Sequence, residues 1–255
     1  MREYPHGLDE EILPEDLEVE QDIINQLEIH VERGYAERKS SLFRGLGKSY
    51  FAVGCCSYAL GESPFKAAEP LRKALEYLYT SFDFGYPQQA YDFIRLLTLA
   101  VVLGNSEIAG SLARTKRERY TNENVEVEEI TFIVAELISA FVRKDEDAVA
   151  KILAENNPDK IEANKIFRYD RMLYLPLLPL LNAVHQKDSA GFSAALQARE
   201  TDFVKFFSRA ERKNDPDALI DMPGLAVAAI ARERGLDFTD RSVYRPSELI
   251  KERNS

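Results

Sequence analysis

One join recurs along the chain: an apolar helical segment runs into a short polar turn, and a second helical segment with small residues begins at once. It occurs as YALGESPFKAAEPL, VVLGNSEIAGSLA, FVRKDEDAVAKIL and VHQKDSAGFSAAL. The turn residues Gly61, Gly104, Lys144 and Lys187 follow one another at intervals of 43, 40 and 43 residues. Such a period is typical of stacked helical hairpins, so we predict an all-α fold of about ten helices, arranged as degenerate hairpins in an α-solenoid like a TPR or HEAT array.

Each join carries residues that end one helix and begin the next. Gly61 and Gly104 favour the left-handed backbone that closes a helix. The residue types after the turns are good N-caps, because their side-chain oxygens accept bonds from free backbone N–H groups: Ser63, Ser106, Asp145 and Asp188. Proline inside a helix is costly, so we expect a boundary near Leu175 and a new helix that starts at Pro176.

Apolar periodicity predicts helices elsewhere too. DIINQLEIHVERGY repeats apolar residues at steps of three and four, whereas YDFIRLLTLAVVLG and ITFIVAELISAFVRK are apolar around most of their circumference, as in helices that lie between other helices. We expect residues 1–255 to form a single all-helical domain, with residues 1–16 as an extended N-terminal segment. A chain of this length needs no disulfide or metal, and Cys55 and Cys56 are expected to be buried thiols.

The charge of the chain restricts its partners. The sequence has 43 acidic against 33 basic residues, a formal net charge of −10. The charge therefore argues against nucleic acid as a partner and a basic protein fits better, although solubility alone can also explain an acidic protein. No apolar run has the length of a signal peptide core or a membrane span, so we expect a cytoplasmic protein with no membrane partner. Monomer and homodimer both remain open.

No pattern in the sequence predicts catalysis. His6, His30 and His185 are far apart and have no metal-ligand spacing, so we expect no metal site. RGLGKS, at 44–49, lacks the frame of a phosphate-binding loop and is expected to lie in a helix. We therefore predict no catalytic residues, no cofactor and no enzymatic activity.

Two stretches instead predict contact surfaces. In SFDFGYPQQAYDF, at 81–93, aromatic residues surround a turn, and aromatic residues are preferred anchors of interfaces. We expect Phe84 and Tyr86 to contact a partner, whereas Phe82, Tyr91 and Phe93 are expected to fold back into the core.

Acidic residues form the second candidate surface. Glu126, Glu129 and Glu136 are expected on one helix, opposite an apolar stripe, and Asp145 and Asp147 follow in KDEDAV. The stripe consists of Ile130, Val134, Leu137 and Phe141. Carboxylates gathered in this way steer basic partners, although a solvated helix face is the simpler interpretation.

The C-terminal stretch IDMPGLAVAAIARERGLDFTDRSVYRPSELI resembles the closing segment of the immunity protein 49 family of bacterial polymorphic toxin systems. The shared features are an Ala-rich helix, a basic end closed by Arg234 and Gly235, and a tail with Tyr244, Pro246 and Leu249. The stretch SLFRGLGKSYFAVGCCSYALGE is also similar to that family. The same features are similar to those of other helical immunity families, including those that neutralise nuclease toxins of type VI and contact-dependent systems. We expect the Ala-rich helix to be the last unit of the array, with Tyr244 and Leu249 folded back as a cap.

The resemblance implies an all-helical cytoplasmic protein that binds and blocks a cognate toxin delivered by neighbouring cells. It supplies no catalytic residues. Our leading hypothesis is an immunity protein that works by stoichiometric occlusion, in which acidic and aromatic side chains cover the active site of a basic toxin, a nuclease being one candidate. The alternative is a helical-repeat adaptor that binds a peptide or a regulator in a concave groove, and an all-α enzyme is the third hypothesis.

Overall fold

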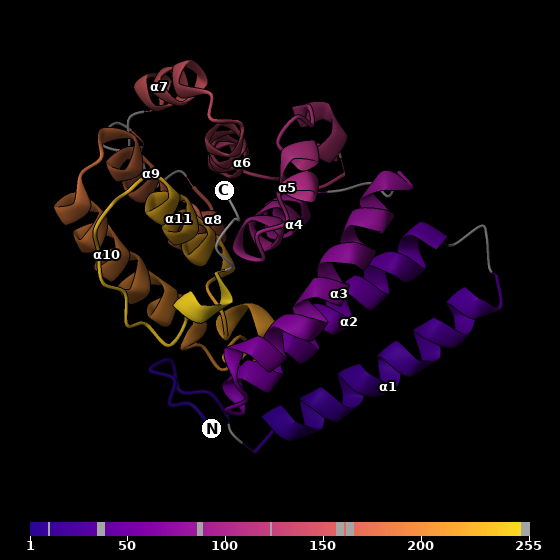
Figure 1. Ribbon diagram of the computed structural model, residues 1–255. Helices are drawn as coiled ribbons and strands as arrows, with labels where there is room; N and C mark the ends of the chain where they lie inside the picture. The colour runs from indigo at the N-terminus through magenta and orange to yellow at the C-terminus, as the bar shows by residue number, and fades with distance from the viewer. Residues whose placement is uncertain are drawn as a thin grey trace. The chain divides into compact units, whose positions relative to one another are not determined.

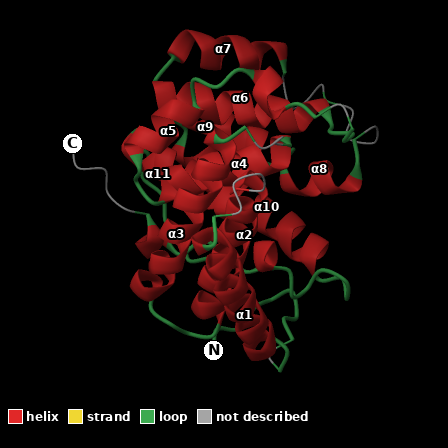
Figure 2. Cartoon of the chain, turned by 90° about the vertical axis from the view of Figure 1, so that its right-hand side faces the viewer, coloured by secondary structure: helices red, strands yellow, loops and turns green. Residues whose placement is uncertain are grey.

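The computed structural model describes residues 1–9, 11–34, 39–85, 89–122, 124–156, 161 and 166–250. Within these ranges the regular elements are α-helices and short 3-10 helices, and none of these residues lies in a strand (Figures 1 and 2). The predicted all-α class is thus confirmed. The chain divides into two compact units: unit 1 comprises Met1–Pro87 and Phe207–Ile220, and unit 2 comprises Gln88–Phe206 and Asp221–Ser255. The prediction of one domain over residues 1–255 stays a prediction.

Unit 1 is built on three long helices and a returning segment. The helices are α1 (Leu13–Glu32), α2 (Lys39–Ala59) and α3 (Pro64–Asp83), and α2 lies between the other two (Figure 1). The returning segment carries the 3-10 helix η5 (Pro216–Ala218). It is tied to the first residues of the chain, because the hydroxyl of Tyr4 donates to the carbonyl of Leu219 (3.0 Å) and His6 Nε2 donates to that of Lys213 (2.8 Å).

Two glycines allow α2 and α3 to approach closely. A Cβ atom on Gly47 would lie 2.5 Å from Leu78 Cγ, and one on Gly54 would lie 2.6 Å from Leu71 Cγ. Positions seven residues apart share a helix face, so both glycines face α3. Cys55 and Cys56 follow on the same helix as buried free thiols, as the sequence predicts.

Unit 2 contains the remaining helices. In chain order they are α4 (Ala90–Val102), α5 (Ser106–Leu112), η2 (Arg117–Tyr120), α6 (Glu129–Arg143), α7 (Glu146–Glu155), α8 (Arg168–Leu173), α9 (Leu177–Gln186), α10 (Ser189–Phe207), α11 (Met222–Glu233) and η6 (Ser247–Leu249). All of α10 except its last residue belongs to this unit. Because α11 packs against α4, α6 and α9, the core of unit 2 forms around it.

The position of α11 corrects the expectation that it ends a linear array. In a solenoid each repeat contacts only its neighbours, but α11 packs against α4, far earlier in the chain. The physical reason is that α11 is buried around most of its circumference, including Leu225, Val227 and Ile230, so it needs neighbours on several sides. The solenoid part of the fold prediction is therefore not confirmed. Tyr244 and Leu249 are buried, as expected for a tail that folds back.

All four predicted joins carry a residue with left-handed backbone, and so does the end of α11 at Gly235. The φ angles are +99° at Gly61, +66° at Gly104, +59° at Lys144, +56° at Lys187 and +80° at Gly235. Lysine takes this conformation at a cost of about 1–2 kcal/mol, because its Cβ crowds the following carbonyl. The turn geometry thus recurs although the residue type changes.

Most of the expected helix starts are confirmed. Ser63, Asp145 and Asp188 accept bonds from the backbone N–H groups of the first turns of their helices. The expectation for Ser106 is wrong, because Asn105 is the N-cap of α5 and accepts from Ile108 N (3.0 Å), which leaves Ser106 as the first helical residue.

The two expectations about helix boundaries have different outcomes. The boundary near Leu175 is confirmed, since α8 ends at Leu173 and α9 begins at Leu177, one residue after the expected start, with Pro176 in the N-cap position. The N-terminal helix instead begins at Leu13, inside the segment expected to be extended. Proline suits the first turn of a helix, and the acidic Glu15 and Asp16 interact favourably with its positive end.

Candidate functional site

Four stacked aromatic rings follow the seam between α2 and α3, and we call them the aromatic ladder. Phe84, directly after α3, stacks on Phe43 with 5.8 Å between ring centroids. Phe43 stacks on Tyr77 (5.9 Å), and Tyr77 stacks on Tyr50 (5.6 Å). Tyr50 is buried, whereas 58% of Phe84 is exposed. Because stacking fixes the ring of Phe84, the ladder presents a preformed apolar contact to solvent.

The buried end of the ladder is polar. The hydroxyl of Tyr50 donates to Glu28 Oε1 on α1 (2.7 Å), and Lys73 Nζ lies 5.0 Å from the centroid of the Tyr50 ring. Burial and the bond to Glu28 raise the pKa of Tyr50, and burial also raises the pKa of Tyr77. Both phenols therefore stay protonated at neutral pH, and the hydroxyl of Tyr50 is already bonded to Glu28.

The aromatic residues of 81–93 divide largely as the sequence predicts. Phe84 is exposed, whereas Phe82 and Phe93 are buried. Tyr91 is half-buried. Tyr86, the second expected contact residue, lies outside the described residues.

Asp170 is a buried carboxylate that the sequence pattern does not reveal. It is fully buried, and it accepts hydrogen bonds from the hydroxyls of Thr131 and Tyr91, the latter at 3.1 Å. The rings of Tyr169 and Tyr174 pack around that of Tyr91. Burial raises the pKa of Asp170, although the two hydroxyls act in the opposite direction. The group stabilises a tyrosine cluster and presents no exposed acid.

The expected acidic face is partly neutralised by an arginine. The guanidinium of Arg117 pairs with both oxygens of Glu129 (2.7 and 2.5 Å) and lies 3.7 Å from Glu136. It also covers the ring of Phe132 at 3.9 Å. Glu126 is exposed but precedes α6, which corrects the expectation that it shares a helix with the other two. Burial raises the pKa of Glu136 in spite of Arg117.

Asp145 and Asp147 flank the start of α7 and differ in their contacts. Asp145 is the N-cap, since its side chain accepts from Ala148 N (3.0 Å), and it lies 3.6 Å from Arg143 Nη2. Asp147 is exposed in the first turn. Asp145 thus has a structural task, whereas the carboxylate of Asp147 faces solvent.

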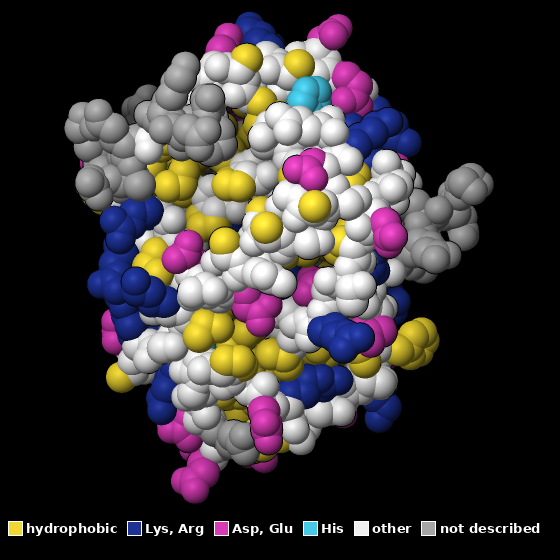
Figure 3. Space-filling view, turned by 90° about the vertical axis from the view of Figure 1, so that its left-hand side faces the viewer, with side chains coloured by type: hydrophobic (Ala, Val, Ile, Leu, Met, Phe, Trp, Pro, Cys, Tyr) yellow, Lys and Arg dark blue, Asp and Glu magenta, His cyan; other side chains and the backbone are white. Residues whose placement is uncertain are grey.

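A polar hollow of about 510 Å³ lies where α6, α9 and α11 end, and sequence reasoning missed it. The buried Phe141 and Ile230 line it together with charged residues. Acidic and basic side chains lie beside a histidine in the upper part of Figure 3. The sequence did contain a signal for this cluster of charges. Lys144 and Lys187 lie just after helix ends, where cations interact favourably with the negative end of the helix dipole.

The charges around the polar hollow pair with one another. Lys144 Nζ lies 3.1 Å from Glu233, and Arg234 lies 2.7 Å from Glu146. His185 Nδ1 is 3.9 Å from the same Glu146. The bond from Arg234 lowers the pKa of Glu146. The hollow is therefore bordered by ion pairs that join helix ends.

Searches for other kinds of site give two results for the described part of the chain. Among those residues, no group of three or more His, Cys, Asp or Glu side chains could hold a metal ion. No helix within the described ranges is long and apolar enough to cross a membrane.

Comparison with known proteins identifies the family. The family model described as immunity protein 49 matches residues 52–249. The chain belongs to the immunity protein 49 family. No curated protein and no solved structure matches it. The resemblance in the C-terminal stretch is thus confirmed, and it extends over most of the chain.

The predicted contact residues all fall within the segment that matches immunity protein 49, but not in one unit. Phe84 belongs to unit 1, whereas the five predicted acidic contact residues belong to unit 2. The structure brings Glu129 and Glu136 together through Arg117. The match begins in the middle of α2, so α1 lies outside the part that this protein shares with the immunity protein 49 family.

A buried ionic network also lies within the immunity protein 49 match and was not predicted. Arg199 pairs with Asp221 through two bonds (2.7 and 2.5 Å), and Arg245 pairs with Asp240 (2.7 Å) and Glu200 (2.8 Å). Arg245 Nη1 also lies 3.5 Å from Asp221 Oδ2. Because both arginines are almost fully buried, the network fixes the tail to α10 and to the start of α11. It is a structural feature and not a candidate binding surface.

Proposed function

We propose that this protein is an immunity protein that binds a cognate bacterial toxin and neutralises it by stoichiometric occlusion of the toxin's active site. Membership of the immunity protein 49 family over residues 52–249 is the observation that carries the proposal. Occlusion needs a folded surface with preformed contacts rather than a catalytic set. The exposed Phe84 on the aromatic ladder supplies one such contact.

Charge supports a basic toxin as the partner. With a net charge of −10, the protein attracts a basic partner and repels nucleic acid. A toxin that acts on nucleic acid tends to be basic, so a nuclease fits this requirement. Neutralisation would take place in the cytoplasm, where the delivered toxin acts.

Co-expression tests the proposal directly. The expected toxin is the C-terminal domain of a long secreted protein encoded immediately upstream of this gene. The chain is produced together with that domain, and growth is compared with that of cells that produce the domain alone. We expect restored growth and a complex that elutes with one copy of each protein. An unrelated helical protein of similar negative charge serves as the control for charge capture. Absence of both rescue and complex refutes the proposal.

Within the same proposal, the toxin contacts the predicted aromatic and acidic residues, which are Phe84, Tyr86, Glu126, Glu129, Glu136, Asp145 and Asp147. The geometry ranks the carboxylates. Glu126 and Asp147 are exposed and make no ion pair with a described residue, so their charge is fully available. Glu129 and Glu136 share Arg117, and Asp145 caps α7, which leaves these three as secondary contacts.

A charge-reversal pair tests this ranking. Glu126→Lys combined with Asp147→Lys is expected to slow association with the toxin domain about threefold to tenfold at low salt, because long-range attraction sets the encounter rate. Glu76→Lys with Glu211→Lys is the control, since both residues are exposed and the net charge changes equally. Equal association rates for the two pairs would remove Glu126 and Asp147 from the interface. Rescue and complex formation by the unmodified protein test neutralisation separately.

A further inference from the structure

The negative charge of the protein is concentrated at its N-terminus. Residues 3–32 contain eleven Asp and Glu residues and no Lys or Arg, which leaves 32 acidic and 33 basic residues in the rest of the chain. The net charge of −10 therefore resides in this segment, most of which forms α1 (Leu13–Glu32). The remainder of the protein is nearly neutral.

The helix α1 has apolar residues on two faces, of which only one is covered. Leu13 and Ile24 are buried on the side that packs against α2. Ile12, Val19 and Ile23 are instead exposed, with exposed fractions of 39%, 57% and 36%. Steps of seven and four residues return to the same side of a helix, so these three form one apolar stripe. A row of apolar side chains in solvent marks an interaction surface more clearly than scattered ones do.

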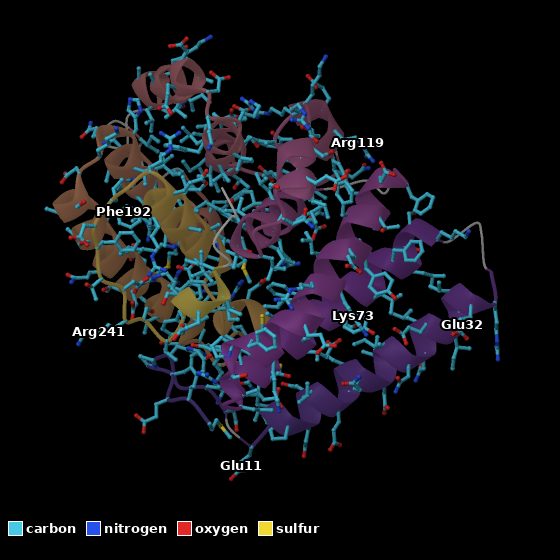
Figure 4. The ribbon with its side chains drawn as sticks, in the orientation of Figure 1. Glu11, Glu32, Lys73, Arg119, Phe192 and Arg241 are labelled. Carbon is cyan, nitrogen blue, oxygen red and sulfur yellow. The ribbon has the colours of Figure 1, made fainter. Side chains whose placement is uncertain are left out.

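Carboxylates border the apolar stripe on both sides. At about 100° per residue, Glu15 and Asp22 lie on one side of it, and Asp16 and Glu20 lie on the other. In Figure 4, Glu11 and Glu32 mark the two ends of α1, and side chains with oxygen tips project from the helix away from α2. None of Glu15, Glu18 and Asp22 forms an ion pair with a described residue. Their charge is therefore available to a partner.

We propose that this outer face of α1, the stripe Ile12, Val19 and Ile23 with its bordering carboxylates, is a recognition surface for a basic protein, namely the toxin. This inference rests on the proposed function and adds a surface on α1 to the toxin contacts proposed above. The apolar stripe supplies the contact, and the carboxylates supply attraction and orientation toward a basic rim. Charge complementarity favours a basic protein as the partner that binds this face. A second copy would bring eleven acidic residues against eleven, and nucleic acids and anionic lipids are repelled.

The extent of the family match supports the assignment. A family model covers what its members share, and it begins at residue 52, after α1. An element that selects one particular toxin is expected to lie outside that shared part, because members that face different toxins need different contacts. In this view α1 provides specificity, and the matched segment provides the common fold.

The experiment measures binding of the purified upstream-encoded toxin domain to the full-length protein and two sets of variants. Val19→Ser with Ile23→Ser removes the apolar contact without changing the charge. The triple variant Glu15→Gln, Glu18→Gln and Asp22→Asn removes charge and keeps the shape. The apolar control is Phe65→Ser, because Phe65 is 78% exposed on α3. The charge control is Glu76→Gln, Glu107→Gln and Glu211→Gln, which alters the same number of exposed carboxylates elsewhere.

The two α1 variants are expected to fail in different ways. The serine pair should dissociate about tenfold faster at any salt concentration, because buried contacts govern dissociation. The charge variant should associate about fivefold more slowly at low salt, and the difference should vanish at high salt. Both controls should bind like the unmodified protein, and circular dichroism should show unchanged helicity in all variants.

The outcomes separate this inference from the proposed function. Unmodified protein that binds the toxin domain, together with α1 variants that bind equally well, overturns the role of α1 and leaves neutralisation intact. Unmodified protein that neither binds nor rescues overturns the proposed function, and the role of α1 falls with it. If ultracentrifugation shows a homodimer that the serine pair converts to monomers while toxin binding is unchanged, the occupant is a second copy and the inference is wrong.

Discussion

Replacing Gly224 with alanine has two opposite effects on stability: it raises the helix propensity of α11 and disturbs the buried ionic network. Gly224 lies in the first turn of α11, where its N–H donates to Asp221 Oδ1 (3.0 Å). An added Cβ would lie 2.1 Å from Asp221 Oδ2 and 2.8 Å from Arg199 Nε. Since ordinary contacts of a carbon atom are about 3.5 Å or longer, the carboxylate has to move away from its place in the network.

The opposing effects differ in size. Alanine in a helix is favoured over glycine by about 1 kcal/mol. Crowding a packed site costs about 1–3 kcal/mol, and breaking one side of a buried ion pair costs about 3–5 kcal/mol. Displacement of Asp221 weakens its 2.7 Å bond with Arg199 without removing either charge. We therefore expect a net loss of about 2 kcal/mol, a large part of the roughly 5–15 kcal/mol that stabilises a protein.

The assay is urea unfolding followed by far-ultraviolet circular dichroism. Gly110→Ala is the matched control, because the added Cβ would lie 3.7 Å from Arg114 Nη1, an ordinary contact. That variant should gain about 0.5–1 kcal/mol from propensity alone. A Gly224→Ala protein as stable as the unmodified one, or more stable, refutes the argument that the network requires glycine there.

Three further predictions concern backbone, charge and thiols. Lys187→Gly should raise the free energy of unfolding by about 1 kcal/mol, because Lys187 has φ +56° and glycine adopts this conformation without strain; a lower urea midpoint contradicts this. Burial raises the pKa of Asp170, so the native state favours the protonated carboxyl group. The stability that protonated Asp170 contributes is therefore lost as pH rises through its pKa in the folded protein. The free energy of unfolding of the Asp170→Asn variant should lack this fall with pH. If the free energies of unfolding of the two proteins change in parallel with pH, the prediction is wrong. Burial raises the pKa of the Cys56 thiol to about 12, and Cys55 is also buried. A disulfide reagent should therefore react with both thiols only in denaturant, and rapid reaction of the native protein would contradict this.

Features set by a few consecutive residues could be predicted from the sequence. Gly61 and Gly104 take positive φ because their lack of a Cβ permits it, and Ser63 caps α3 through a bond to a residue three positions on. The break before α9 follows from Pro176 alone. In each case the cause and its effect lie within one turn of helix.

Features that depend on distant partners could not be predicted. Arg199 and Arg245 look like ordinary surface residues in the sequence, but each is buried against carboxylates whose positions the tertiary fold determines. Likewise, the acidic pattern around Glu129 did not reveal Arg117, which comes twelve residues earlier and pairs with it. The candidate surface was therefore predicted by residue type, whereas its charge balance required the structure.

The division into discontinuous units has a consequence for synthesis of the protein. Tyr4 needs Leu219 as its partner, and α4 needs α11, so unit 1 is not complete until residues 207–220 are made, and unit 2 is not complete until α11 is made. At about 5–20 residues per second, the first residues wait on the order of 10–40 s for the segment that binds them. During that interval the apolar surface of α4 lacks the helix that covers it, which is the condition under which nascent chains need chaperones. A message truncated before α11 would thus yield a chain that cannot complete the core of unit 2, because α4, α6 and α9 all pack against α11.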